Sequence, residues 1–130
     1  MEIPEGLFYT KDHEWVEPVG DGKIRLGITD YAQHELGDVV YVDLRPEGTA
    51  VRKGDPVGTV ESVKAVSDVY TPVSGVIART NGELEASPEL VNSDCYGKGW
   101  MVVIEGAVKA DLDLLMDAAS YRAHIEKEAK

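Results

Sequence analysis

The sequence predicts a mostly β fold, either a sandwich or a barrel, with a helix packed on its outside. Short runs of β-branched and aromatic residues alternate with turn residues along most of the chain. Towards the C-terminus, the apolar residues change to helical spacing. The chain has 130 residues, of which 43% are hydrophobic, and this suits one globular domain. We expect a single domain over residues 1–130, with its core at about 20–105 and a C-terminal helical segment at about 111–127.

The first predicted elements are a strand, a short helix and a second strand. In residues 24–28, isoleucine and leucine alternate with arginine and glycine, which is typical of a half-buried strand. Asp30 is placed to begin a helix, because Gln33 follows three residues later as in a capping box. Gly37 is placed to end that helix. The run 39–44 is β-branched and aromatic and predicts the next strand.

A hairpin is predicted near the middle of the chain. Residues 50–51 form a short strand between two glycine-containing turns. The runs 57–60 and 66–70 are valine-rich and predict a pair of longer strands. Residues 61–65 connect them without glycine, asparagine or proline, and the segment 72–75 makes a second turn.

The last third of the chain changes from loop to strand to helix. Residues 81–96 are rich in turn formers, so we expect at most one short helical turn there. The apolar run 100–104 has the length of a strand. From Asp111 onward the pattern is helical, because four apolar residues within 112–119 follow i, i+3, i+4 and i+7 spacing. A break is expected within 117–120.

Charge and cysteine content limit the partners and the compartment. The formal net charge is −11, from 24 acidic and 13 basic residues. Such a surface repels phosphate backbones and anionic lipids, so we expect neither nucleic acid nor a membrane as a partner. Cys95 is the single cysteine and cannot close an internal disulfide, which fits a reducing compartment. The N-terminal residues resemble no targeting signal, and we expect a cytoplasmic protein.

A search for catalytic or metal-binding residues finds little. The chain contains three histidines, His13, His34 and His124, and their spacing forms no metal-binding pair. Cys95 is followed by Tyr96 and preceded by Asp94, neighbours that disfavour a reactive thiolate. No serine stands in a Gly-x-Ser-x-Gly elbow. We therefore expect a protein that is not an enzyme and holds no metal.

Lys64 is the residue with the most unusual setting. It is the only cation between Lys53 and Arg79, and it lies midway between the two predicted hairpin strands. Glu61 precedes it and Asp68 follows it in an otherwise apolar stretch. A modifying enzyme needs an exposed amine on a rigid support, which a hairpin tip provides. Lys64 is therefore predicted to be the attachment point of a prosthetic arm.

At these residues the sequence resembles a known family. The segment 61–68, Glu-Ser-Val-Lys-Ala-Val-Ser-Asp, running into Pro-Val-Ser-Gly at 72–75, is similar to the lipoyl-attachment segment of the glycine cleavage system H proteins. The likeness extends from about Ile3 to Tyr121, because long blocks recur in the right order. The further blocks are Tyr9 with 13–16, 27–33, 36–40, 88–92, and Tyr96-Gly97 with Gly99-Trp100.

The resemblance implies a fold and a function. The fold would be a barrel-sandwich hybrid of two small sheets with short peripheral helices and a C-terminal helix. Lys64 would carry lipoate in amide linkage after recognition by a lipoate-attaching enzyme, with Glu61 serving that recognition. The loaded arm would take an aminomethyl group from the pyridoxal-phosphate-dependent glycine decarboxylase to the tetrahydrofolate-dependent aminomethyltransferase. Dihydrolipoamide dehydrogenase would then reoxidise the dithiol of this carrier, which we expect to be a monomer.

The resemblance also implies a cleft that shelters the loaded arm from water. Glu14 and Asp68 match the cleft positions, and Asp12 and Thr71 are further candidates. Carboxylates suit an ammonium-like end group through charge attraction.

The sequence departs from the family pattern at two places. Cys95 stands where many members have proline, so the loop before Tyr96 is expected to be less rigid. Some members place a histidine at the position of Glu35, whereas His34 lies one residue earlier. Neighbouring helical residues are rotated by about 100°, which argues against a role for His34 in the cleft.

Two other carriers remain open as alternatives. A biotin-carrying domain uses a related hairpin, but its acceptor lysine typically lies between methionines, whereas Val63 and Ala65 flank Lys64 here. A lipoate-relay protein that hands lipoyl groups to other enzymes would use the same lysine.

Overall fold

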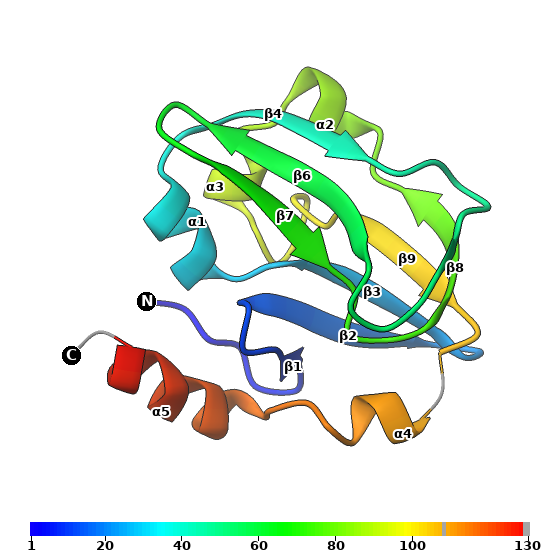
Figure 1. Ribbon diagram of the computed structural model, residues 1–130. Coiled ribbons are helices and arrows are strands. Elements are labelled where there is room, and N and C mark those ends of the chain that lie inside the picture. Colours follow the sequence, from blue (N-terminus) through cyan, green and yellow to red (C-terminus); the bar gives the residue numbers. More distant parts are fainter. Residues whose placement is uncertain (108, 129–130) are drawn as a thin grey trace.

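The computed structural model describes residues 1–107 and 109–128 and contains two antiparallel sheets (Figure 1). One sheet has six strands, in the order β1 (Phe8–Tyr9), β2 (Glu14–Gly20), β3 (Lys23–Ile28), β9 (Val102–Glu105), β8 (Gly75–Thr80) and β5 (Ala50–Val51). The other has three, in the order β4 (Val39–Leu44), β6 (Pro56–Ser62) and β7 (Val66–Tyr70). The mostly β prediction is confirmed.

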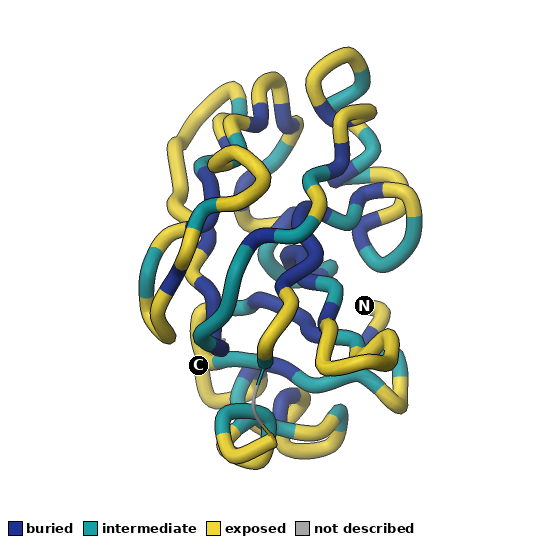
Figure 2. Tube along the Cα trace, turned by 90° about the vertical axis from the view of Figure 1, so that its right-hand side faces the viewer, coloured by how far each residue is buried: buried dark blue, intermediate teal, exposed yellow. Residues whose placement is uncertain are grey.

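The main core lies between the two sheets. Val42, Val60 and Val69 of the three-stranded sheet belong to one buried cluster with Leu26 and Ile104 of the six-stranded sheet. Figure 2 shows buried stretches in the middle of the molecule, with exposed turns around them. The buried valines of these strands therefore form the inner layer of the sandwich on the side of the three-stranded sheet.

The helix α1 (Asp30–Leu36) covers one end of the sandwich. Its cap is Thr29, whose side chain accepts a hydrogen bond from the backbone N–H of Ala32. The helix therefore begins at Asp30 as predicted, but the predicted capping box is wrong, because the cap is Thr29. Asp30 instead accepts a hydrogen bond from the side chain of Gln33, at 2.7 Å. Gly37 ends the helix as predicted, with a φ of 79° that favours glycine.

Two short helices, α2 (Glu83–Ala86) and α3 (Leu90–Ser93), lie in the loop-rich region. The sequence predicted at most one such turn there. The region is ordered by polar side chains that bond to backbone, a pattern that periodicity does not reveal. The side chain of Asn81, for example, donates to the carbonyl oxygens of Lys98 and Trp100.

The C-terminal segment is divided into α4 (Lys109–Leu112) and α5 (Ala118–Glu128). The break begins earlier than predicted, because Met116 exchanges two backbone hydrogen bonds with Tyr9, at 2.8 and 2.9 Å. The predicted apolar stripe therefore does not lie on one helix. None of the helices among the described residues is both long enough and apolar enough to cross a bilayer.

A second, smaller core joins the two ends of the chain. Tyr9, Trp15 and Tyr121 are each fully buried, and the rings of Tyr9 and Tyr121 stack with 4.6 Å between centroids. Figure 1 shows α5 lying beside β1 and β2. Neither β1 nor β2 was predicted from the sequence. In β2, Trp15 and Val16 are adjacent and both buried, which breaks the expected alternation.

Candidate functional site

Lys64 lies at the tip of the β6–β7 hairpin, as predicted (Figure 1). The strands pair as far as Glu61 and Val66. Ser62 closes the turn, since its backbone N–H donates to the carbonyl oxygen of Ala65 at 2.8 Å. The Ser62 hydroxyl oxygen also accepts from the N–H groups of Lys64 and Ala65, at 3.3 and 3.0 Å. A serine side chain thus supplies the order that glycine or asparagine gives to other turns.

The tip is fastened to the turn between α1 and β4. The backbone N–H of Val63 donates to the carbonyl oxygen of Asp38 at 3.1 Å. A Cβ atom at Gly37 would lie 3.5 Å from Cε of Lys64, so the aliphatic part of the lysine passes beside this glycine. The tip is therefore held against the turn between α1 and β4, while Lys64 stays exposed.

Asn92 of α3 organises that supporting turn. Its amide nitrogen donates to the carbonyl oxygen of Gly37 and to the side chain of Gln33, both at 2.9 Å. Its oxygen accepts from the backbone N–H of Val39 at 2.8 Å. One side chain thus connects α1, α3 and the start of β4. Sequence reasoning gave Asn92 no role, because its partners are far from it in the chain.

The surroundings of Lys64 leave its amine accessible. Val63 and Val66 are 70% and 66% exposed. Within residues 1–107 and 109–128, the ion pairs involve His13, Arg25 and His124, and Lys64 takes part in none of them. Glu61 is also exposed and pairs with Tyr41 on one side and with Val66 on the other. An enzyme that approaches Lys64 would therefore meet apolar side chains and one carboxylate.

A cleft of about 310 Å³ lies against this hairpin and begins beside its tip. Ala65 and Val66, which follow Lys64 in the chain, line one end of it. The remaining wall comes from β7, α1 and the loop before β2. Among the predicted cleft residues, Asp12, Glu14 and Asp68 line it. Tyr31, Glu35 and His13 also line it and were not predicted.

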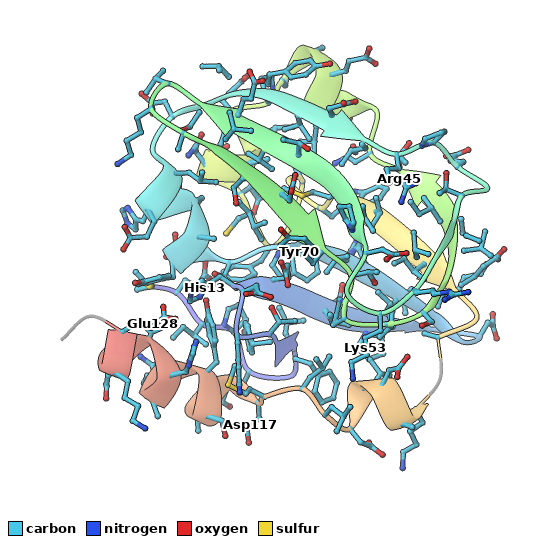
Figure 3. The ribbon with its side chains drawn as sticks, in the orientation of Figure 1. His13, Arg45, Lys53, Tyr70, Asp117 and Glu128 are labelled. Carbon is cyan, nitrogen blue, oxygen red and sulfur yellow. The ribbon has the colours of Figure 1, made fainter. Side chains whose placement is uncertain are left out.

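Glu14 is a buried carboxyl group in the wall of the cleft, with 2% of its surface exposed. The Thr10 hydroxyl donates to Oε1 at 2.6 Å, and the Tyr70 backbone N–H donates to Oε2 at 3.2 Å. Figure 3 labels Tyr70 on β7 above this loop. Burial raises the pKa of Glu14 to about 7, against the opposing effect of these hydrogen bonds, and the nearby charge of Asp12 raises it further. A cation that entered the cleft would favour the ionised form.

The other predicted cleft residues differ in their settings. Asp12 and Asp68 are exposed, and Asp68 accepts a hydrogen bond from the Thr59 hydroxyl at 3.2 Å. Thr71 is buried, and its hydroxyl both donates to and accepts from the backbone of Val73. Thr71 lines a second cleft of about 410 Å³, which shares Asp12 and Glu14 with the first. Its side chain thus belongs to a turn, and the structure does not place it in the cleft beside Lys64.

Two residues that depart from the family pattern have clear positions. His34 is exposed and is not among the residues that line the cleft, whereas Glu35 is. Cys95 is buried, and its carbonyl oxygen accepts a hydrogen bond from the Trp15 indole at 2.9 Å. Burial, with the charges of Asp30 and Glu2, raises the pKa of the Cys95 thiol to about 12. The thiol therefore stays protonated at neutral pH.

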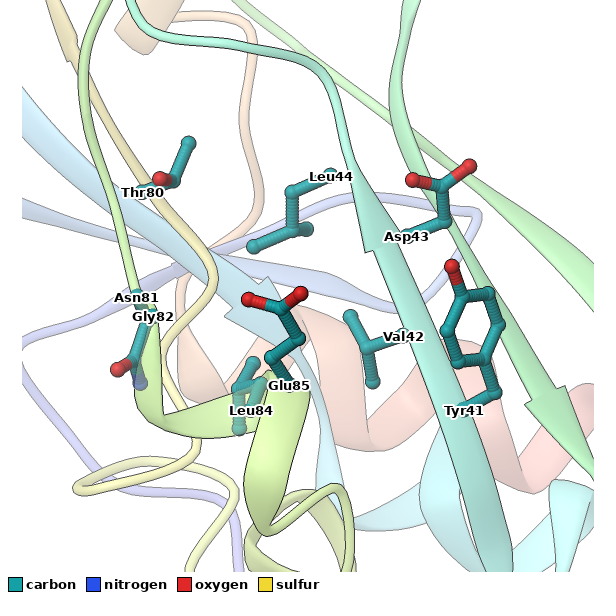
Figure 4. Close-up of a pocket in the computed structure, with 9 residues that line it drawn as sticks. All are labelled: Tyr41, Val42, Asp43, Leu44, Thr80, Asn81, Gly82, Leu84 and Glu85. Carbon is teal, nitrogen blue, oxygen red and sulfur yellow. The ribbon is translucent and has the colours of Figure 1, made fainter.

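Two further features are a separate cavity and a pair of histidines. A cavity of about 180 Å³ lies between β4 and the start of α2 (Figure 4), and none of the predicted site residues lines it. The fold brings two of the histidines together, because the rings of His13 and His124 lie 5.8 Å apart. Their separation in the sequence concealed this proximity.

Comparisons with known proteins agree with the geometry. The family model "Glycine cleavage H-protein" matches residues 7–128. The glycine cleavage system H protein of Thermus thermophilus is 53% identical over 129 residues, covering 99% of this chain and 100% of that protein. The H protein of Mycolicibacterium vanbaalenii is 52% identical over 127 residues, covering 95% and 97%.

A solved structure shows the same architecture. The crystal structure of the glycine cleavage system H protein from Mycobacterium marinum superposes with a TM-score of 0.85 at 38% identity. It covers 95% of this chain and 99% of that one, which agrees with the two-sheet sandwich and its C-terminal helix. The chain therefore belongs to the glycine cleavage H-protein family, the non-catalytic lipoyl carriers of the glycine cleavage system.

Proposed function

We propose that Lys64 carries lipoate in amide linkage and is the only lysine of this chain that does so. The observation that carries the proposal is the position of Lys64, whose exposed amine stands on a hairpin tip fastened through Val63 to Asp38. Such a tip holds the amine at a fixed place without burying it. Glu61, exposed three residues earlier, serves as a recognition point for the lipoate-attaching enzyme.

The loaded arm then folds back into the cleft that begins at Ala65 and Val66. Its aminomethyl group ends in an amine, which carries a positive charge near neutral pH. Glu14, Asp12 and Asp68 supply carboxyl groups in the walls, so charge attraction favours the docked arm. Docking also keeps water from the labile adduct. Thr71 supports this wall through the turn that it closes.

The chemistry belongs to the arm and to the partner enzymes. Glycine decarboxylase, with pyridoxal phosphate, would release the carboxyl group of glycine as CO2 and transfer the aminomethyl group to one sulfur of the lipoyl disulfide, which would open and be reduced. Aminomethyltransferase passes the one-carbon unit to tetrahydrofolate and releases ammonia. Dihydrolipoamide dehydrogenase reoxidises the dithiol. A net charge of −11 favours partners with basic docking surfaces. The single cysteine fits a cytoplasmic protein, and a monomer suits a carrier that moves between three enzymes.

The decisive experiment compares wild-type protein with the Lys64→Arg variant after incubation with a lipoate-attaching enzyme. Intact-mass and peptide-mass measurements are expected to show one lipoyl group on Lys64 and none on the variant. Lys53→Arg, at another exposed turn, is the matched control and should be modified like wild type. Modification that persists in Lys64→Arg would refute the assignment.

Loading separates the carrier function from its alternatives. Lipoylated protein incubated with glycine and the decarboxylase should gain the mass of the aminomethyl group. A lipoate relay would instead transfer its lipoyl group to other acceptor proteins without being loaded. A biotin carrier would gain biotin at Lys64 when offered a biotin-attaching enzyme.

A further inference from the structure

Three potential metal ligands from the two ends of the chain meet beside the cleft. Nε2 of His13 lies 2.9 Å from one carboxylate oxygen of Glu128, and Nε2 of His124 lies 3.1 Å from the other. Figure 3 shows His13 above α5 with Glu128 near the end of that helix. The ligand atoms of all three residues lie within 4.8 Å of one another.

The spacing suits a small divalent ion. Zinc binds imidazole nitrogen and carboxylate oxygen at about 2.0–2.2 Å, so adjacent ligands of a tetrahedral ion lie about 3.4 Å apart. The two nitrogen–oxygen separations of 2.9 and 3.1 Å are close to this value. His124 and Glu128 stand one helical turn apart on α5, so their side chains share a face.

A chain of hydrogen bonds orients the His13 ring through Nδ1, the ring nitrogen that does not contact Glu128. Its Nδ1 lies 2.9 Å from the Tyr121 hydroxyl, which lies 2.7 Å from the Thr29 hydroxyl. Thr29 accepts from a backbone N–H of α1, and its oxygen can accept the Tyr121 proton as well. The Tyr121 oxygen is then free to accept from Nδ1–H of His13. In this tautomer, Nε2 of a neutral His13 carries a lone pair that faces the carboxylate.

A lone pair on Nε2 of His13 that faces the Glu128 carboxylate is unfavourable unless a proton or a metal ion lies between the two atoms. A proton on Nε2 is one solution, and a metal ion is the other. Metal-binding histidines commonly donate their second ring N–H to such a partner, which fixes the ring and raises its basicity. The net charge of −11 also draws cations to this protein.

We propose that His13, His124 and Glu128 bind one divalent transition-metal ion, for which Zn²⁺ is the appropriate probe. Histidine and carboxylate ligands favour zinc and its neighbours over calcium or magnesium. The ion fastens the last turns of α5 to the loop before β2. Since His13 also lines the cleft, the ion stands at the edge of the space proposed for the arm. Three protein ligands leave a coordination position open.

The test uses untagged, metal-free protein in the Lys64→Arg background, so that lipoyl sulfur cannot bind the metal. Titration calorimetry with zinc chloride is expected to show one ion per chain. The His124→Asn and Glu128→Gln variants should each bind at least about tenfold more weakly. Zinc should raise the melting temperature of the parent by about 5 °C or more, and that of these variants much less.

Two controls keep the result interpretable. His34→Asn removes an exposed histidine outside the cluster and should bind zinc like the parent. Circular dichroism of each variant verifies folding, and the partly exposed Glu128 allows a change of charge without loss of core. Absence of saturable zinc binding would overturn the proposal. Equal affinity in His124→Asn, Glu128→Gln and the parent would overturn it too, and would leave these residues as ion pairs only.

Discussion

The backbone N–H of Val63 donates to the carbonyl oxygen of Asp38 over 3.1 Å and joins the hairpin tip to the turn that follows α1. Two segments distant in sequence thereby hold Lys64 at a defined place. The same turn is held by the side chain of Asn92, which bonds to Gly37 and Val39. The position of Lys64 thus depends on α3, which acts on it indirectly through this turn.

Replacement of Asn92 by alanine is expected to weaken this support. Three hydrogen bonds are lost, and partly buried backbone groups are left without partners. The free energy of unfolding should fall by about 2 kcal/mol. Urea denaturation measures the change, and Ser93→Ala, at an exposed neighbouring position, is the matched control. If both variants unfold at the same urea concentration as wild type, Asn92 contributes nothing to the turn.

Replacement of Glu61 by alanine is expected to slow lipoylation without unfolding the domain. The side chain is exposed, so its loss leaves no buried group unpaired. Loss of one contact with the attaching enzyme should lower the lipoylation rate by about two- to fivefold, because that factor corresponds to the free energy of one exposed ion pair. A lipoylation assay measures the rate, and Glu83→Ala, which removes an exposed carboxylate on α2, is the matched control. An unchanged rate would make Glu61 an ordinary surface residue.

Replacement of Glu14 by alanine is expected to speed loss of the aminomethyl group from loaded protein. A weaker attraction shifts the arm from docked to free, and each ~1.4 kcal/mol changes that ratio tenfold. We expect release to rise by up to about tenfold, as measured by formaldehyde or ammonia formation. Glu14→Gln retains most of the shape and hydrogen bonding, so it separates charge from packing.

The two Glu14 variants distinguish docking from stability. The carboxyl group also joins Thr10 to Tyr70, so Glu14→Ala could act by loosening the loop. In that case its melting temperature should fall while release from the folded protein stays constant. If both variants had the release rate and the melting temperature of wild type, neither role of Glu14 would hold.

Replacement of Gly27 by alanine is expected to destabilise the second core. A Cβ atom at this position would lie 2.8 Å from the indole nitrogen of Trp15, which is fully buried. Overpacking of this kind costs about 1–3 kcal/mol. Thermal unfolding measures the loss, and Gly82→Ala is the control because nothing lies within 4 Å of its Cβ position. Equal melting temperatures for the two variants would show that Trp15 can move aside.

The Cys95 thiol is expected to resist alkylation in the native protein. Its pKa, raised by burial to about 12, leaves very little thiolate at pH 8. Iodoacetamide should therefore react slowly with folded protein and rapidly after denaturation in guanidinium. Rapid modification of the folded protein at pH 8 would show that the loop before Tyr96 opens.

The sequence predicted those parts of the fold whose signals are local. The bounds of β4, β5 and β7 agree with the predicted strands at 39–44, 50–51 and 66–70, and each of these strands places at least one valine in the core. Thr29 was missed as a cap because Asp30 with Gln33 forms an equally good local pattern. The break before α5 was misplaced because Met116 pairs with Tyr9, a contact from the other end of the chain.

The same distinction applies to the site. Lys64 could be found from its isolation among apolar residues, and Glu14 and Asp68 from the family resemblance. Nothing local pairs His13 with His124, because only the packing of α5 brings their rings within 5.8 Å of each other. The raised pKa of Glu14 also depends on burial that only the folded chain produces.

The stacked rings of Tyr9 and Tyr121 have a consequence for biosynthesis. All strands of both sheets are complete once Glu105 has left the ribosome, so the hairpin that bears Lys64 can assemble early. Ile3, Tyr9 and Trp15 have to wait for Tyr121 and Ile125, their partners in the second core. A nascent chain would therefore display the finished hairpin that bears Lys64 while its earliest-synthesised aromatic residues are still uncovered.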